Sequence, residues 1–135
     1  MAQKVLIVED DGNIAELLHL YLEKEGFETK VAKDGGKGVE YFRSFQPDLV
    51  LLDISLSDGN GFAVCSAVKA LYQLPVIFLT ASGDEYSTVT GFEVGADDYV
   101  PKPFRPRELL MRIKIVLRRT SSDGGIVRLA RVEVD

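Results

Sequence analysis

The chain has 135 residues, of which 46% are hydrophobic and 27% are charged, as expected for one ordinary globular domain. Its formal net charge of -5 argues against strong nucleic-acid binding by this chain alone. No apolar run approaches the roughly 20 residues of a membrane-spanning helix, and acidic residues come too early for a secretory signal. The single cysteine, Cys65, excludes an internal disulfide. We therefore expect a cytoplasmic protein that does not enter a membrane.

Five short segments predict strands, over residues 4–8, 27–32, 48–53, 75–80 and around 99–100. The segments 4–8, 48–53 and 75–80 are mainly apolar, which is typical of parallel strands that are buried on both faces. Segment 27–32 alternates instead, which predicts a strand nearer an edge of the sheet.

Apolar spacing of three and four residues predicts helices after the strands, over 14–25, 39–45, 61–71, about 84–94 and 105–119. The helix over 84–94 has the weakest signal, because it contains Thr88, Val89, Thr90 and Gly91. Strands that alternate with helices predict an α/β fold, a right-handed doubly wound parallel sheet of the (βα)5 type. The strand order 2-1-3-4-5 is one of its two common solutions.

Polar residues follow these strands at their carboxyl ends, where ligands bind in open parallel sheets. Glu9 and Asp10 follow the first strand, and Asp53 ends the third. Thr80 ends the fourth strand and Lys102 follows the fifth. The order 2-1-3-4-5 would place Glu9 and Asp10 beside Asp53.

Three adjacent carboxylates, Glu9, Asp10 and Asp11, repel one another, and two interpretations of them stay open. A divalent cation such as Mg²⁺ would remove the repulsion, and acidic capping of the following helix would also use negative charge. With Asp53 added, Mg²⁺ is the natural occupant of the cluster. A carboxylate is also a competent nucleophile toward phosphorus. Mg²⁺, the Lys102 ammonium group, and the Thr80 hydroxyl with a backbone N–H could each contact one oxygen of a phosphoryl group.

Other candidate motifs favour structural roles. The glycines of segment 34–38 match neither common phosphate-loop pattern and follow the second strand. His19 lies off the apolar stripe of its helix and is expected at the surface, and Cys65 is expected in the core. An aspartate-nucleophile phosphatase would need a second acid where this chain has Ser55, and a dinucleotide-binding domain would need glycines after the first strand.

Segments 8–11, 52–53, 79–81 and 95–104 together resemble the receiver domain of bacterial two-component response regulators, which has the CheY-like (flavodoxin-like) fold. The resemblance spans residues 4 to about 119. It implies a regulatory phosphoacceptor, not an enzyme, that receives a phosphoryl group from a sensor histidine kinase on Asp53.

The same resemblance assigns further roles. Mg²⁺ would be held by Glu9, Asp10, Asp53 and the backbone carbonyl of Ser55. Thr80 and Tyr99 would be the switch pair. Lys102 would pair with the phosphoryl group, and the Lys102–Pro103 bond would be cis.

The basic segment 102–119 is similar to that of the OmpR/PhoB type, transcription factors with a winged-helix output domain. This similarity divides the chain into a receiver over 1–120, a linker over 121–125 and the first strand of a truncated DNA-binding domain over 126–135. DNA would be bound only through the missing output domain. A stand-alone receiver that acts by protein contact is the alternative, in which 126–135 would be an ordered part of this domain.

The OmpR/PhoB resemblance also implies a homodimer through the fourth helix, fifth strand and fifth helix. The matching charged residues are Asp97, Asp98, Glu108, Arg112 and Arg119. Thr88 departs from the pattern, because a basic residue is usual at that position. The loss of one exposed ion pair, about 0–1 kcal/mol, predicts weaker dimerisation.

Overall fold

A computed structural model of the chain describes residues 2–53, 61–71, 74–81 and 97–124. The predicted elements within these ranges are all present, with small differences at their ends. In chain order they are β1 (Lys4–Val8), α1 (Gly12–Lys24), β2 (Glu28–Ala32), α2 (Gly35–Phe45), β3 (Leu49–Asp53), α3 (Gly61–Leu71), β4 (Val76–Ala81), β5 (Asp98–Lys102) and α5 (Pro106–Gly124). The helix predicted over 84–94 lies outside the described residues, as does segment 126–135.

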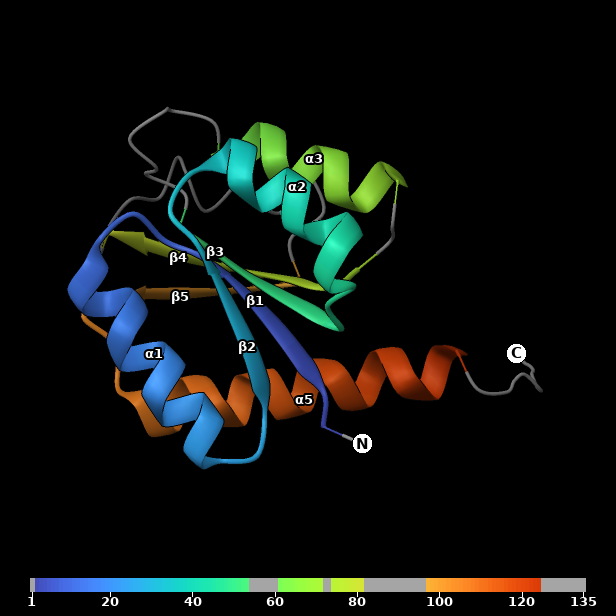
Figure 1. The fold of residues 1–135 in the computed structure, drawn as a ribbon. Helices are drawn as coiled ribbons and strands as arrows, with labels where there is room; N and C mark the ends of the chain where they lie inside the picture. The colour runs from blue at the N-terminus through green and yellow to red at the C-terminus, as the bar shows by residue number, and fades with distance from the viewer. Residues whose placement is uncertain (1, 54–60, 72–73, 82–96, 125–135) are drawn as a thin grey trace.

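The five strands form one parallel sheet in the order β2-β1-β3-β4-β5 (Figure 1), which confirms the predicted order. Val8 of β1 lies opposite Leu52 of β3, and Asp53 lies opposite Leu79 of β4. The carboxyl ends of β1, β3 and β4 are therefore neighbours at the same end of the parallel sheet.

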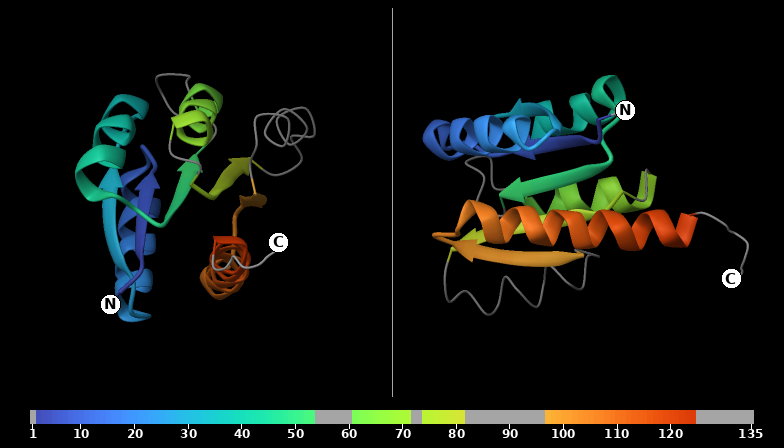
Figure 2. Two further views of the ribbon diagram at one scale, coloured as in Figure 1. Left: turned by 90° about the vertical axis from the view of Figure 1, so that its right-hand side faces the viewer. Right: turned by 90° about the horizontal axis from the view of Figure 1, so that it is seen from below.

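Helices cover both faces of this sheet, α1 and α5 on one side and α2 and α3 on the other (Figure 2). The alternation of side chains along β1 explains both layers, since successive residues point to opposite faces. Val5 and Ile7 pack with α1 and α5, whereas Leu6 and Val8 pack with α2 and α3. All four are fully buried, as expected for a central parallel strand.

The three- and four-residue spacing predicts an apolar stripe of Ile14, Leu17, Leu18, Tyr21 and Leu22 on the first helix, and the buried stripe of α1 is narrower. Ala15, Leu18 and Leu22 are buried, but Leu17, expected on the same face, is 48% exposed. The helix ends as expected before Gly26, whose φ of 97° is the left-handed conformation that glycine adopts most easily.

The last helix is longer than predicted. It was expected to end at Arg119, before a linker over 121–125, but α5 continues through Gly124. Segment 120–123 contains no proline, and its serines and threonine only mildly disfavour a helix, so the helix runs on to the first glycine. Among the described residues, no helix is both long and apolar enough to cross a bilayer.

Candidate functional site

Three carboxylates meet where β1 and β3 end. One oxygen from each of Glu9, Asp10 and Asp53 lies within 4.8 Å of the others. Glu9 is completely buried, Asp53 is 2% exposed and Asp10 is half-buried. Like charges in so little water repel strongly, so this arrangement requires compensating positive charge.

Lys102 supplies part of that charge from the end of β5. Its Nζ lies 2.9 Å from Glu9 Oε1 and donates a hydrogen bond to Asp53 Oδ2 at 3.2 Å. Burial alone would lower the pKa of Lys102, but the carboxylates of Glu9 and Asp53 together outweigh it and hold that pKa above its ordinary value. The ammonium group therefore stays charged beside the cluster.

One cation is insufficient for Glu9. Burial and the neighbouring Asp53 carboxyl raise the pKa of Glu9 to about 7, although Lys102 and the amide of Asp11 oppose this. Asp11 N donates to Glu9 Oε2 at 3.1 Å. The buried Oε1 lies 2.9 Å from Lys102 Nζ and has no further polar partner among the described residues. Hard divalent cations prefer carboxylate oxygens, so this set of three carboxylates fits Mg²⁺.

The three adjacent acids of the sequence have separate roles. Asp11 caps α1, since its Oδ1 accepts hydrogen bonds from Asn13 N at 2.9 Å and Ile14 N at 3.2 Å. Glu9 and Asp10 instead join Asp53. The capping interpretation is therefore confirmed for Asp11, and the cation interpretation stays a prediction for Glu9 and Asp10.

Thr80 and Tyr99 lie on the two strands beyond β3 in the sheet. Thr80 is in β4 opposite Pro101, one position beyond the residue that faces Asp53. Tyr99 is 8% exposed and its ring packs against Phe78, with 5.4 Å between centroids. The Lys102–Pro103 peptide bond is cis, as expected, and Ser55 lies outside the described residues.

Comparison with known proteins shows the family of this chain. The sequence profile of the response regulator receiver domain matches residues 5–114. The chain belongs to this family.

Two groups of relatives agree with this assignment. The DNA-binding response regulator MtrA of Mycobacterium tuberculosis is 43% identical over the whole chain, which spans 60% of that relative's length. The receiver domain protein of Methanospirillum hungatei is 31% identical, with a TM-score of 0.88 over 92% of this chain and all of that one. The BeF3-activated N-terminal receiver domain of Klebsiella pneumoniae RstA is 34% identical, with a TM-score of 0.81 over 86% of this chain and 99% of that one.

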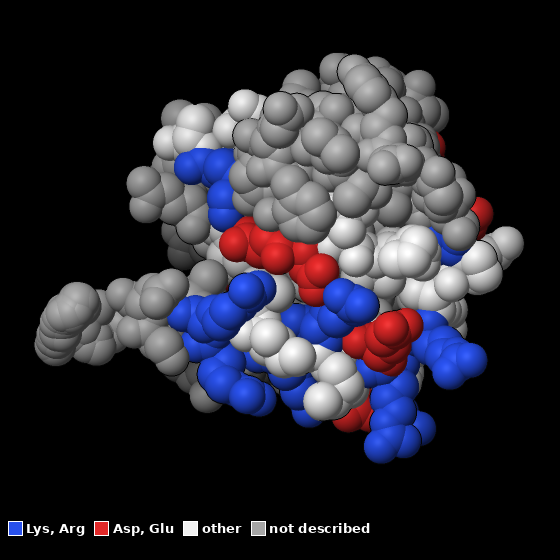
Figure 3. Space-filling model, turned by 180° about the vertical axis from the view of Figure 1, so that it is seen from behind, with Lys and Arg blue, Asp and Glu red and all other residues white. Residues whose placement is uncertain are grey.

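Most charged residues expected at a dimer face already have partners within this receiver domain. Arg112 Nη1 lies 3.1 Å from Asp98 Oδ1 and 3.0 Å from Asp98 Oδ2, and its Nη2 lies 3.7 Å from Glu108. Arg119 is exposed, and Thr88 lies outside the described residues. Figure 3 shows that Lys and Arg side chains gather over the surface that includes α5.

Asp97 has a role that the sequence did not indicate. Its Oδ2 accepts hydrogen bonds from Lys69 Nζ of α3 and from Val76 N at the start of β4, both at 2.9 Å. Lys69 also donates to Leu74 O at 3.2 Å. In this protomer the carboxylate is therefore bound to α3 and β4. No motif marks Lys69 as its partner, because the two residues are 28 positions apart.

The glycine segment is structural, as predicted. Asp34 caps α2 by accepting a hydrogen bond from Lys37 N at 2.8 Å. A side chain at Gly38 would place its Cβ 3.1 Å from Val8 Cγ2, so glycine allows α2 to approach β1.

The structure also locates the histidine and the cysteine. Cys65 is fully buried, and burial raises the pKa of its thiol to about 11, which confirms a core role. His19 was expected to be solvated, but it is half-buried and hydrogen-bonded to Thr29.

Proposed function

We propose that this receiver domain accepts a phosphoryl group on Asp53 from a sensor histidine kinase in the cytoplasm. The observation that carries the proposal is a nearly buried carboxylate, that of Asp53, between two acids and one ammonium group. Such a carboxylate has no purely structural advantage, since charges buried together cost free energy. It is, however, well placed as a nucleophile.

The transfer would proceed by attack of one Asp53 oxygen on the phosphorus of a phosphohistidine. A phosphorus–oxygen bond forms, the phosphorus–nitrogen bond breaks, and the imidazole leaves with its electron pair. Lys102 already lies 3.2 Å from Asp53 Oδ2, so its ammonium group would move little to contact the new phosphoryl oxygens. Charge neutralisation of this kind provides most of the catalysis in phosphoryl transfer.

Mg²⁺ would be held by Glu9, Asp10 and Asp53, with the backbone carbonyl of Ser55 as a further ligand. When bound, the ion would neutralise charge on the transferred group. The close approach of the three carboxylates, whose oxygens lie within 4.8 Å of one another, supports this ligand set. We infer that the domain is a regulatory phosphoacceptor whose phosphorylated state is the output.

The output would pass through Thr80 and Tyr99 to a homodimer formed by the fourth helix, β5 and α5. The chain spans 60% of the length of relatives named as DNA-binding response regulators. We therefore propose a receiver of the OmpR/PhoB type that controls transcription through a DNA-binding output domain following residue 125. Because Asp97 and Asp98 are paired within the protomer, a contact across the dimer would compete with these pairs.

The experiment is phosphorylation by acetyl phosphate with Mg²⁺, followed by intact mass. The mass should rise by one phosphoryl group, and Asp53→Asn should abolish the rise. Asp11→Asn is the matched control, because Asn remains a good helix cap and residue 11 lies next to the cluster but outside it. Labelling that persists in Asp53→Asn would refute the phosphoacceptor assignment.

A second measurement tests the dimer. Beryllofluoride with Mg²⁺ mimics the acyl phosphate, and sedimentation velocity should then show a larger dimer fraction. An unchanged monomer would contradict the OmpR/PhoB assignment and leave phosphorylation of Asp53 unaffected.

A further inference from the structure

β2 is the outermost strand at one side of the sheet, and a side chain accepts a hydrogen bond from one of its outward-facing backbone amides. Glu28 N donates to Gln3 O at 3.0 Å, and Ala32 O accepts from Glu9 N at 2.9 Å, so the backbone of both residues faces β1. Alternate residues of a strand direct their backbone groups to opposite sides, so the amide of Thr29 points away from the sheet. Figure 1 shows β2 in front, with β1 behind it.

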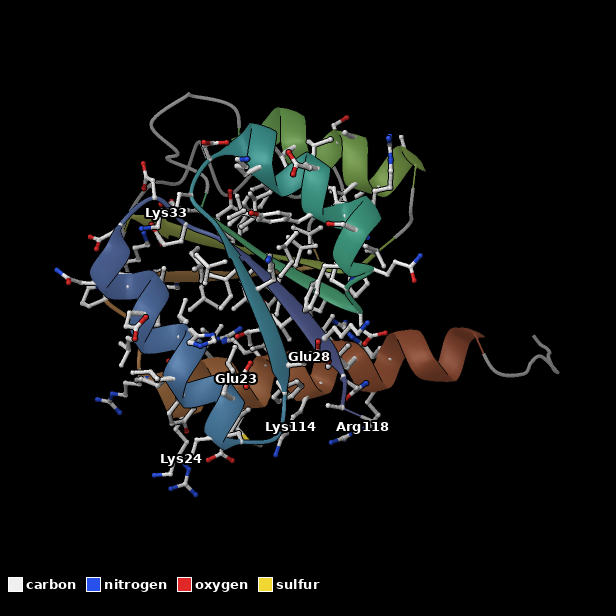
Figure 4. All side chains as sticks on the ribbon, in the orientation of Figure 1. Glu23, Lys24, Glu28, Lys33, Lys114 and Arg118 are labelled. Atoms are coloured by element: carbon white, nitrogen blue, oxygen red, sulfur yellow. The ribbon has the colours of Figure 1, made fainter. Side chains whose placement is uncertain are left out.

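That outward amide is bound by a side chain from α1. Glu23 Oε2 accepts a hydrogen bond from Thr29 N at 2.9 Å and a second one from Thr29 Oγ1 at 3.1 Å. Figure 4 shows Glu23 on α1 beside β2. A carboxylate that accepts from a backbone amide forms a stronger hydrogen bond than a neutral carbonyl does.

His19 completes this contact from one turn earlier on α1. Its Nδ1 is hydrogen-bonded to Thr29 Oγ1. A threonine hydroxyl has one hydrogen, and here that hydrogen is directed to Glu23. His19 Nδ1 must then be the donor and carry a hydrogen, which makes His19 a positioning residue for the hydroxyl.

On the opposite face of the sheet, a β2 side chain contacts α2. Lys30 Nζ lies 4.8 Å from the centroid of the Tyr41 ring on α2, and the Lys30 side chain is exposed. Charged residues on an edge strand, lysine above all, hinder its pairing with another chain.

We propose that Glu23 prevents the outer strand β2 from pairing with β2 of a second copy of this chain. Its carboxylate binds Thr29, whose hydroxyl is also hydrogen-bonded to His19. A strand that pairs along the whole of β2 would use the Thr29 amide as one of its hydrogen-bond donors, and its neutral carbonyl would have to displace an anionic acceptor. Any dimer of this domain would therefore form through a surface other than β2.

The test compares Glu23→Ala with Glu23→Gln, which retains an acceptor oxygen, and with Glu16→Ala, an exposed acid on the same helix. Amide hydrogen exchange at Thr29 should accelerate at least tenfold in Glu23→Ala. The amide of Lys30, which faces β1, serves as the internal reference for an intact fold. Glu23→Gln and Glu16→Ala should keep Thr29 protected.

Sedimentation velocity then measures the consequence. Without a phosphodonor, Glu23→Ala should show concentration-dependent self-association and the wild type and Glu16→Ala should not. Glu23→Gln should lie between them, because its neutral amide is a weaker acceptor than the carboxylate. Unchanged exchange at Thr29, or a Glu23→Ala variant that stays monomeric at every concentration, would overturn the proposal. Nitrogen-15 spectra of His19 should show a hydrogen on Nδ1 at neutral pH, and a hydrogen on Nε2 alone would overturn the donor assignment.

Discussion

Lys102 Nζ lies 2.9 Å from Glu9 Oε1, although the two residues are far apart in the chain. Both side chains are directed to the same point because β1 and β5 are parallel and end at the same edge of the sheet. The contact matters for stability, since the Glu9 side chain is completely buried and that of Lys102 is only 22% exposed.

Lys102→Met tests this contact. In metal-free protein at pH 8, the variant should lose about 2–4 kcal/mol of unfolding free energy, somewhat less than a fully buried pair would cost. Added Mg²⁺ should reduce this difference, because the ion would replace part of the missing charge. Urea unfolding with and without Mg²⁺ measures both effects. Lys37→Met, which removes an exposed ion pair at 3.8 Å, should change stability by under about 1 kcal/mol.

The raised pKa of Glu9 predicts the pH dependence of the metal-free domain. The pKa is about 7 in the folded protein, against an ordinary value of 4.5. Between these values the folded chain holds more protons than the unfolded chain. The free energy of unfolding should therefore fall as pH rises through this window, by about 3 kcal/mol in total.

Glu9→Gln removes the titrating group and should flatten that dependence. Urea unfolding of both proteins at pH 5 and pH 8, without Mg²⁺, gives the comparison. The free energy of unfolding of Glu9→Gln minus that of the wild type should be larger at pH 8 than at pH 5. Parallel pH profiles would show that Glu9 does not titrate in this window.

Asp97 and Arg119 were expected in the same dimer face, yet the structure predicts different effects for them in the monomer. Asp97→Ala should lower the unfolding free energy by about 1–3 kcal/mol, because Val76 N and Lys69 lose their acceptor. Arg119→Ala changes an exposed side chain and should stay within about 0.5 kcal/mol. Urea unfolding without a phosphodonor separates the two, and equal effects would contradict the structural role of Asp97.

Cys65 offers a test of packing in α3. Its buried thiol, with a pKa of about 11, should resist iodoacetamide at pH 8.5 while the protein is folded, since the thiolate is the reactive species. In urea the same thiol should react quickly. Mass spectrometry over time measures the labelled fraction, and rapid labelling in native conditions would show that α3 opens readily.

Much of this protein was predictable because the relevant signals are local. Periodicity placed the strands and helices within a few residues, and the parallel pattern indicated the sheet. Carboxylates directly after apolar runs marked Glu9, Asp10 and Asp53 as a candidate cluster. Helix ends were less accurate, as α5 shows, because serine and threonine neither favour nor stop a helix strongly.

The sequence by itself determined which residues stand at the ends of strands, since that depends only on neighbours along the chain. Only the tertiary structure decided which side chains meet. Asp97 contacts Lys69, Thr29 contacts Glu23 and His19, and Asp11 caps α1 while Glu9 contacts Lys102. Strand order and helix placement determine these pairings, and both result from burial of apolar surface across the whole domain.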